Sequence, residues 1–218
     1  MTNEQTQLRG ALAVYLVMGL QSVNGKTALG VAKEALEGGI TMLQLREKHA
    51  PLRQVLREGR AIRELCRSYN VPFLVNDRID VAMLLEADGV HVGQDDIPAS
   101  EARSLLGPQA IIGMSAGTEE EVHIALQENP DYLGIGPIYA TATKGDAGAP
   151  IGTRLLEWSQ KQASLPMVGI GGITAGNAGE VITAGADGVA VVSAITAAGD
   201  PGQAASKLRS IVHTMLLR

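Results

Sequence analysis

Eight short apolar runs, rich in β-branched residues, recur along the 218-residue chain at a mean spacing of about 25 residues. Helical periodicity follows the runs, most clearly over residues 27–37, 52–69, 118–128 and 203–217. The runs are continuously apolar rather than alternating, which is typical of parallel strands covered on both faces. We therefore expect strands that start near Val14, Thr41, Pro72, Gly89, Ala110, Tyr132, Pro166 and Gly188.

A short sequence echo accompanies these runs. The segments EADGVHVG (86–93), NPDYLGIG (129–136) and GADGVAVV (185–192) each place an aspartate just before an apolar run. They introduce every second expected strand, namely the fourth, the sixth and the eighth. Eight alternating strand–helix units in about 200 residues predict a (β/α)8 TIM barrel. A doubly wound open sheet is the alternative, and eight strands without a domain break make it the weaker one.

We expect one domain over residues 1–218, because no linker or charge block interrupts the series, with residues 1–10 as a flexible N-terminal extension. Hydrophobic residues make up 45% of the chain, which is enough for a large core. A net charge of −5 and six aromatic residues argue against a nucleic-acid or anionic membrane partner. The single cysteine, Cys66, and a polar start that lacks a signal-peptide pattern favour the cytoplasm.

Active sites of such barrels lie at the carboxyl ends of the strands, so polar residues at those ends are the candidates. The second run leads into Gln44, Arg46 and Lys48, which share one parity and project to the same side of a strand. Two cations and an amide on one face suit a phosphate or a diphosphate. Alternatively, the odd-numbered residues face inward, which would leave these three on the helix-covered face.

Two neighbouring strand ends carry acids. The third run ends at Asn76 and Asp77, and the fourth is followed by Asp95 and Asp96. Since adjacent strands lie about 4.8 Å apart, Asp77 and Asp96 can hold one hard cation between them. Mg²⁺ fits, because it takes one or two carboxylates and completes its shell with water and phosphate oxygens. Alternatively each aspartate caps a helix, and for Asp95 we favour capping or plain exposure.

Glycines and hydroxyls follow the last strands. The run 169–173 contains Gly171, and Val192 and Ser193 follow the eighth run, where backbone amides near a helix start can cradle a phosphate. A glycine run can also serve a tight turn alone. The fifth run holds Ser115, which can meet the hydrogen bonds of a ring, and His91 in the fourth run is interpreted as a satisfied core histidine.

The loop after the sixth run is long and rich in small residues. It carries Thr141, Thr143 and Lys144 at the expected mouth of the barrel. Hydroxyls and an ammonium group on such a loop suggest a lid that closes over phosphates. A solvated loop with a spare lysine is the alternative.

Six segments, taken in order, resemble the thiamine-phosphate synthases: QLREK (44–48), ND (76–77), HVGQDD (91–96), GPIYATATK (136–144), GIGGI (169–173) and VVSAI (191–195). The resemblance spans roughly residues 15–211. It implies a transferase that joins a hydroxymethylpyrimidine diphosphate to a thiazole phosphate with release of pyrophosphate. It also implies one Mg²⁺ per subunit and small-molecule substrates, and it is compatible with a homo-oligomer.

By the same resemblance, Arg46, Lys48 and Lys144 are the catalytic cations, and Asp77 and Asp96 hold the metal. The substrate-binding residues are Gln44, Arg46, Lys48, Asn76, Ser115, Thr141, Thr143, Lys144, Gly171, Val192 and Ser193. The synthases commonly have a histidine where this chain has Gly117, and we expect this departure to affect the wall near the pyrimidine. Related thiazole tautomerases use a histidine in the same region to move a proton, so Gly117 also argues against that activity. A phosphate-binding module without catalysis would need the glycine cradle but not the paired aspartates.

Overall fold

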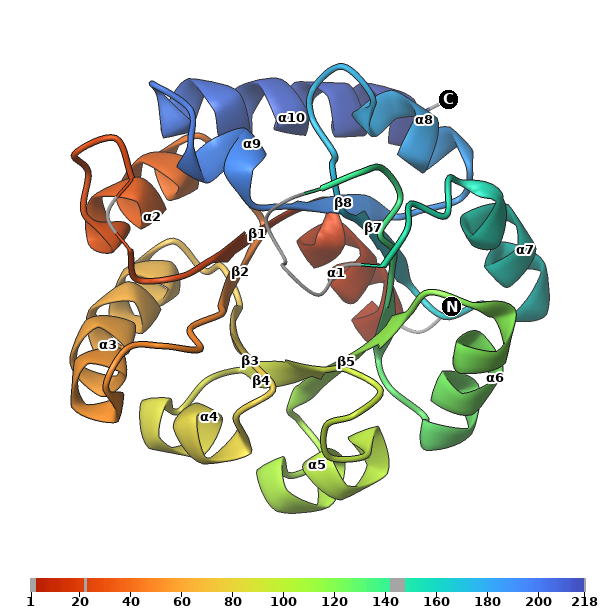
Figure 1. Ribbon diagram of the computed structural model, residues 1–218, viewed down its shortest axis with the longest axis horizontal. Helices are drawn as coiled ribbons and strands as arrows, with labels where there is room; N and C mark the ends of the chain where they lie inside the picture. Colours follow the sequence, from red (N-terminus) through yellow and green to blue (C-terminus); the bar gives the residue numbers. More distant parts are fainter. Residues whose placement is uncertain (1–2, 22, 142–147, 218) are drawn as a thin grey trace.

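The computed structural model describes residues 3–21, 23–141 and 148–217. In this part of the chain, eight parallel strands in sequence order form a closed barrel inside a ring of helices (Figure 1). The strands are β1 (Val14–Met18), β2 (Met42–Leu45), β3 (Phe73–Asn76), β4 (Gly89–Val92), β5 (Ile111–Ala116), β6 (Tyr132–Ile135), β7 (Met167–Ile170) and β8 (Gly188–Val191). The predicted (β/α)8 barrel is confirmed, and each strand begins within one residue of its expected start.

The helices follow the strands around the barrel. They are α1 (Asn3–Leu12), α2 (Ala28–Glu37), α3 (Leu52–Ser68), α4 (Ile79–Leu85), α5 (Ala99–Leu106), α6 (Glu119–Glu128), α7 (Arg154–Gln162), α8 (Ala178–Thr183), α9 (Ser193–Thr196) and α10 (Pro201–Leu216). Side-chain caps begin several of them: Thr27 and Thr118 each accept a backbone hydrogen bond at 3.1 Å, and Asp200 accepts one at 2.8 Å. No helix in the described ranges combines the length and apolarity needed to cross a bilayer.

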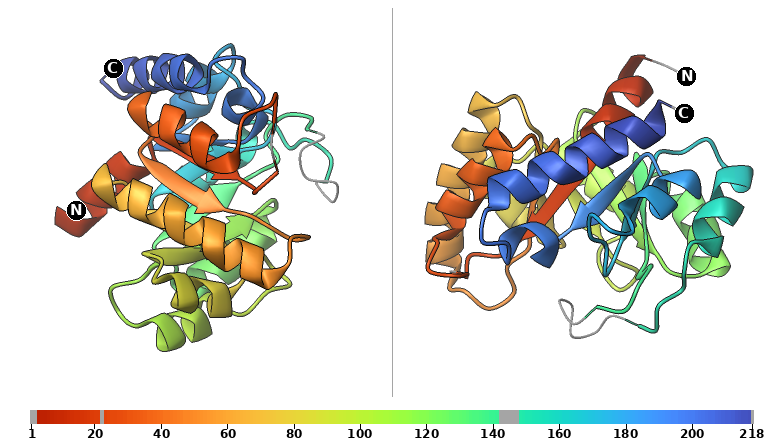
Figure 2. Two further views of the ribbon diagram at one scale, coloured as in Figure 1. Left: turned by 90° about the vertical axis from the view of Figure 1, so that its left-hand side faces the viewer. Right: turned by 90° about the horizontal axis from the view of Figure 1, so that it is seen from above.

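The beginning of the chain differs from the flexible extension expected over residues 1–10. Residues Asn3–Leu12 form α1, which lies on the side of the barrel opposite the carboxyl ends of the strands (Figure 2). Leu8 packs against the interior cluster that contains Leu12. Arg9 forms an ion pair with Asp187 and donates to the carbonyl of Ser164. The local sequence pattern does not predict this helix, because Arg9 contacts Ser164 and Asp187, which lie far along the chain.

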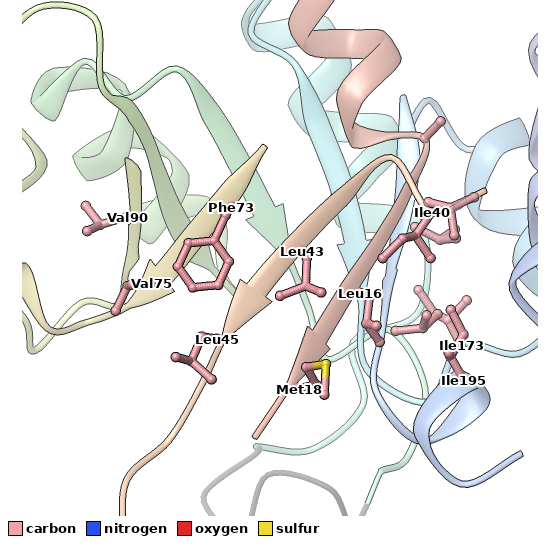
Figure 3. Packing of buried hydrophobic residues seen from close by; sticks show 14 of the residues in the cluster. Leu16, Met18, Ile40, Leu43, Leu45, Phe73, Val75, Val90, Ile173 and Ile195 are labelled. Atoms are coloured by element: carbon pink, nitrogen blue, oxygen red, sulfur yellow. The ribbon is translucent and has the colours of Figure 1, made fainter. Parts of the chain in front are cut away.

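Alternate residues of each strand enter two separate apolar layers. The interior layer contains the side chains of Tyr15, Val17, Met42, Leu74, Tyr132, Val168 and Ala190. The outer layer lies between strands and helices and includes Leu16, Leu43 and Leu45 (Figure 3). On β2 the even-numbered residues therefore face the interior, so the alternative in which Gln44 faces the helices is wrong.

The recurring aspartates tie the strands together in pairs. Each lies just before an even-numbered strand, and its carboxylate accepts a hydrogen bond from the backbone of the preceding odd-numbered strand. The contacts are Asp88 Oδ2 with Phe73 N at 2.8 Å, Asp131 Oδ2 with Ile112 N at 2.7 Å, and Asp187 Oδ2 with Met167 N at 2.9 Å. Before β2, Thr41 Oγ1 accepts from Val14 N at 2.8 Å in the same way. The barrel is thus built from four similar strand pairs.

Candidate active site

A cavity of about 510 Å³ opens at the carboxyl ends of β1, β2 and β8. Its volume falls within the range of small-molecule sites. Arg46, Lys48 and Val192 are among its lining residues, so two predicted cations and one predicted contact share it. A second hollow, of about 350 Å³, lies among α7, α8 and α10. Glu157 and Glu180 line that hollow, and their charge does not suit a phosphate.

The loop after β2 is held in place by Glu47, which the sequence analysis did not single out. Its carboxylate accepts hydrogen bonds from the backbone amides of Leu20 at 3.0 Å, His49 at 2.9 Å and Ala50 at 3.1 Å. Burial raises the pKa of Glu47, but the three backbone donors outweigh it and hold that pKa below its ordinary value. Glu47 thereby fixes the loop that carries the two cations, because it joins this loop to the end of β1.

Asp77 lies at the centre of a polar cluster between β3 and β4. Its Oδ2 lies 3.3 Å from Lys48 Nζ, and its Oδ1 accepts from Asn76 Nδ2 at 2.8 Å. Burial raises the pKa of Asp77, and the adjacent carboxyl of Asp96 raises it further, while Lys48 opposes both effects. Asp96 in turn accepts from Gly93 N at 2.7 Å. The structure therefore brings Lys48, Asn76, Asp77 and Asp96 together at the ends of β2, β3 and β4.

Asp95 stands apart from this cluster. Its side chain is exposed in the turn after β4. The expectation of plain exposure at this position is therefore confirmed. Its neighbour Gln94 points toward the next strand and donates to the carbonyl oxygen of Ser115 at 2.7 Å.

Gln44 and Ser115 reach the barrel interior from opposite sides. Gln44 is buried, and its Nε2 donates to the hydroxyl of Tyr15 at 2.5 Å. Ser115 Oγ lies 2.9 Å from Nε2 of His91, whose Nδ1 lies 2.9 Å from the hydroxyl of Tyr132. His91 is thus a satisfied core histidine, as predicted. Tyr15 and Tyr132 do not stand out in the sequence as polar residues, because both lie within apolar runs.

The loops after β6 and β7 lie against each other. Tyr139 N donates to the carbonyl oxygen of Gly171 at 3.0 Å. Gly171 has a positive φ of 97°, and a Cβ there would lie only 2.7 Å from Pro137 Cα. Only glycine allows this close approach, so the backbone geometry itself requires glycine at position 171. Thr141 follows in the same loop and is half-buried.

The last predicted contacts lie after β8. Val192 lines the cavity, and Ser193 begins the short helix α9. The first amides of a helix have no acceptor within it, so they can bind an anion. Thr143 and Lys144 fall outside the described residues.

Gly117, which departs from the histidine expected for the family, follows β5 and donates its amide to Glu121 Oε2 at 2.6 Å. A Cβ at this position would lie 3.0 Å from the carbonyl oxygen of Gly136. The loop after β6 therefore leaves little room for a larger side chain here. This geometry agrees with the argument against a histidine-dependent activity.

The structure is a closed (β/α)8 barrel. Cations, carboxylates and a glycine loop lie at the carboxyl ends of its strands, which is typical of barrels that bind phosphorylated ligands. The chain matches the thiamine monophosphate synthase family over residues 14–195 and belongs to it. The thiamine-phosphate synthase of Moorella thermoacetica is 50% identical over 199 residues, covering 91% of this chain and 95% of the relative. That of Chloroflexus aurantiacus is 48% identical, covering 91% and 92%.

A solved structure supports the same assignment. The thiamine phosphate pyrophosphorylase from Pyrococcus furiosus matches this fold with a TM-score of 0.86. It is 39% identical in sequence, and the match covers 96% of this chain and 99% of that one. The family expected from the six segments is therefore confirmed.

Proposed function

We propose that this protein is a thiamine-phosphate synthase, which joins an aminopyrimidine methyl diphosphate to a thiazole phosphate and releases pyrophosphate. The observation that carries the proposal is the placement of Lys48 3.3 Å from Asp77, beside Asp96 and at the edge of a cavity that Arg46 also lines. A simple phosphate cradle needs cations and amides but no facing carboxylates. Membership of the family supports the same activity.

Arg46 and Lys48 would hold the diphosphate of the pyrimidine substrate. When the bond between the methylene carbon and the diphosphate oxygen breaks, its electron pair leaves with the diphosphate. Preorganised cations stabilise the charge that develops there, with the planar fork of Arg46 suited to two oxygens at once. Asn76 would donate to the same phosphates. The resemblance assigns Lys144 a matching role.

The aspartate pair fits Mg²⁺ in its donor set. Asp77 and Asp96 are hard oxygen donors, and their mutual repulsion is what a divalent cation between them would relieve. Within the described residues no group of three or more metal-ligating side chains occurs, so water and diphosphate oxygens would complete the shell. When bound, Mg²⁺ would neutralise charge on the departing diphosphate.

The thiazole phosphate would bind at the loops after β6, β7 and β8. Thr141, Gly171, Val192 and Ser193 are the residues we assign to it among those described, with Thr143 added by the resemblance. Its ring nitrogen is itself a nucleophile and forms the new bond to the methylene carbon. The reaction therefore needs no general base from the protein. Gln44 and Ser115 would bind the pyrimidine ring.

We further propose that the enzyme works in the cytoplasm. Cys66 is a free, buried thiol, which suits a reducing compartment. Burial raises the pKa of Cys66 to about 12, so the thiol stays protonated and takes no part as a nucleophile.

Pyrophosphate binding, measured by calorimetry with and without Mg²⁺, tests the assignment of the site. We expect Mg²⁺ to tighten binding at least about tenfold, and Lys48→Ala to weaken it by about 10- to 100-fold, because a charged hydrogen bond is lost. Lys33→Ala, on the exposed face of α2, is the matched control and should bind like the wild type. Binding that ignores Mg²⁺ would instead indicate a phosphate-binding module.

A further inference from the structure

An unbroken series of hydrogen bonds crosses the barrel interior from β2 to β5. We call it the interior chain, and its members are Gln44, Tyr15, Tyr132, His91 and Ser115. The contacts are Gln44 Nε2 with Tyr15 OH at 2.5 Å, Tyr15 OH with Tyr132 OH at 2.9 Å, Tyr132 OH with His91 Nδ1 at 2.9 Å, and His91 Nε2 with Ser115 Oγ at 2.9 Å. Both ends of the interior chain are residues that we assign to the pyrimidine ring.

The direction of the first two hydrogen bonds follows from the donor at the β2 end. An amide nitrogen can only donate, so the hydroxyl oxygen of Tyr15 accepts from Gln44. Tyr15 is fully buried, and its single hydroxyl proton goes to its other partner, Tyr132. Burial raises the pKa of both phenols, so each keeps its proton.

The remaining hydrogen bonds then have one consistent direction. Tyr132 accepts from Tyr15 and so donates its own proton to Nδ1 of His91. With Nδ1 as an acceptor, the neutral ring carries its proton on Nε2 and donates to Ser115 Oγ. The hydroxyl proton of Ser115 is therefore directed away from His91.

We propose that Tyr15, Tyr132 and His91 are positioning residues that make Ser115 a hydrogen-bond donor toward the substrate ring. This inference rests on the proposed function, in which Ser115 contacts the pyrimidine. A ring nitrogen with a free lone pair is the acceptor that such a donor selects. The interior chain thereby contributes to specificity for a nitrogen heterocycle, although its three inner members do not touch the substrate.

The opposite direction makes a distinct prediction. If Gln44 presented its carbonyl oxygen to Tyr15, each of the four hydrogen bonds in the interior chain would reverse its direction. His91 would then carry its proton on Nδ1, and Ser115 would offer only lone pairs to the ring. The tautomer of His91 therefore reports the direction of the whole chain.

Nitrogen-15 NMR of histidine-labelled protein without substrate is the first arm of the test. The signal of His91 is identified by its loss in His91→Asn. We expect a neutral ring with the proton on Nε2 and none on Nδ1. A proton on Nδ1, alone or together with one on Nε2, would overturn the proposal. This arm does not depend on catalysis.

A double-mutant cycle of Tyr132→Phe and Ser115→Ala is the second arm, measured by pyrophosphate release. We expect Tyr132→Phe to lower kcat/KM for the pyrimidine diphosphate about tenfold when Ser115 is present, and less than about twofold in Ser115→Ala. The KM for the thiazole phosphate should stay unchanged. Equal losses in both backgrounds would contradict action through Ser115.

Tyr69→Phe, on the exposed end of α3, is the control for the loss of a phenol oxygen and should match the wild type. If the wild type releases no pyrophosphate at all, the proposed function fails. The NMR arm then still decides the direction of the interior chain, so the two failures remain distinguishable.

Discussion

Asp77 is a residue of the proposed metal site whose ionised form is disfavoured by its surroundings. Its pKa is raised in the folded protein by burial and by Asp96, so above that pKa the ionised form destabilises the folded state relative to the unfolded one. Its backbone is left-handed, with a φ of 60°, a conformation that asparagine also tolerates. The geometry thus permits a neutral, nearly isosteric replacement.

Asp77→Asn should therefore stabilise the metal-free protein while disabling it. We expect a Tm increase of about 2–4 °C by calorimetry without Mg²⁺, since about 1 kcal/mol of repulsion is relieved. We expect turnover to fall at least about 100-fold, because a metal ligand is lost. A variant that keeps both its turnover and its Mg²⁺ dependence would show that Asp77 is not a ligand.

Glu47 should contribute to stability in a pH-dependent way. Its pKa in the folded protein lies below the ordinary 4.5, so its contribution is present above that ordinary value and is lost as the pH falls through the lowered pKa. Glu47→Gln should lower the urea midpoint at pH 7 and narrow the difference between pH 7 and about pH 3, which lies well below the ordinary pKa. Glu37→Gln, on the exposed face of α2, is the control. Equal pH dependence in wild type and Glu47→Gln would contradict this role.

At the scale of the elements, three of the four strand pairs depend on the aspartates that precede β4, β6 and β8. Asp187 accepts from the backbone of Met167 and pairs with Arg9 of α1. Asp187→Ala should lower the free energy of unfolding by about 2–4 kcal/mol, since it removes both contacts. Asp80→Ala removes an exposed pair with Arg78 and local backbone contacts at the start of α4, and should cost less than about 1 kcal/mol. Similar urea-unfolding losses in the two variants would contradict the role of the strand-pair contacts.

Most strands could be predicted from sequence because they are largely apolar runs with glycine, proline or aspartate on at least one side. The exception is β2, which lies between Thr41 and Arg46. Helix α1 could not be predicted, because its stability comes from the packing of Leu8 and from the contact between Arg9 and Asp187, which are 178 residues apart. Such contacts exist only once the barrel has closed. For the same reason, the sequence alone does not predict that the recurring aspartates pair the strands.

The candidate site was predictable to the extent that its residues follow strand ends directly. Lys48, Asp77 and Asp96 come from different strands, and parallel topology alone brings them together. Tyr15 and Tyr132 were not predictable, because β1 and β6 meet only across the interior of the closed barrel. The roles of Thr143 and Lys144, and the presence of Mg²⁺, stay predictions.

For the molecule as a whole, closure of the barrel brings the carboxyl ends of β2 to β8 to the same end of the molecule, where we propose a single site. The cations and the acids follow β2, β3 and β4, whereas the glycine loop and the start of α9 follow β7 and β8. In the proposed function, the two phosphorylated substrates would therefore approach one another from opposite sides of this end of the barrel. This arrangement is the structural basis of the proposed condensation.

Release of pyrophosphate, measured with each substrate alone and with both, in the presence and absence of Mg²⁺, is the decisive test of the proposed condensation. We expect rapid release only when the pyrimidine diphosphate, the thiazole phosphate and Mg²⁺ are all present, with thiamine phosphate formed in equal amount. Folded protein that binds the thiazole phosphate but releases no pyrophosphate under any of these conditions would contradict it.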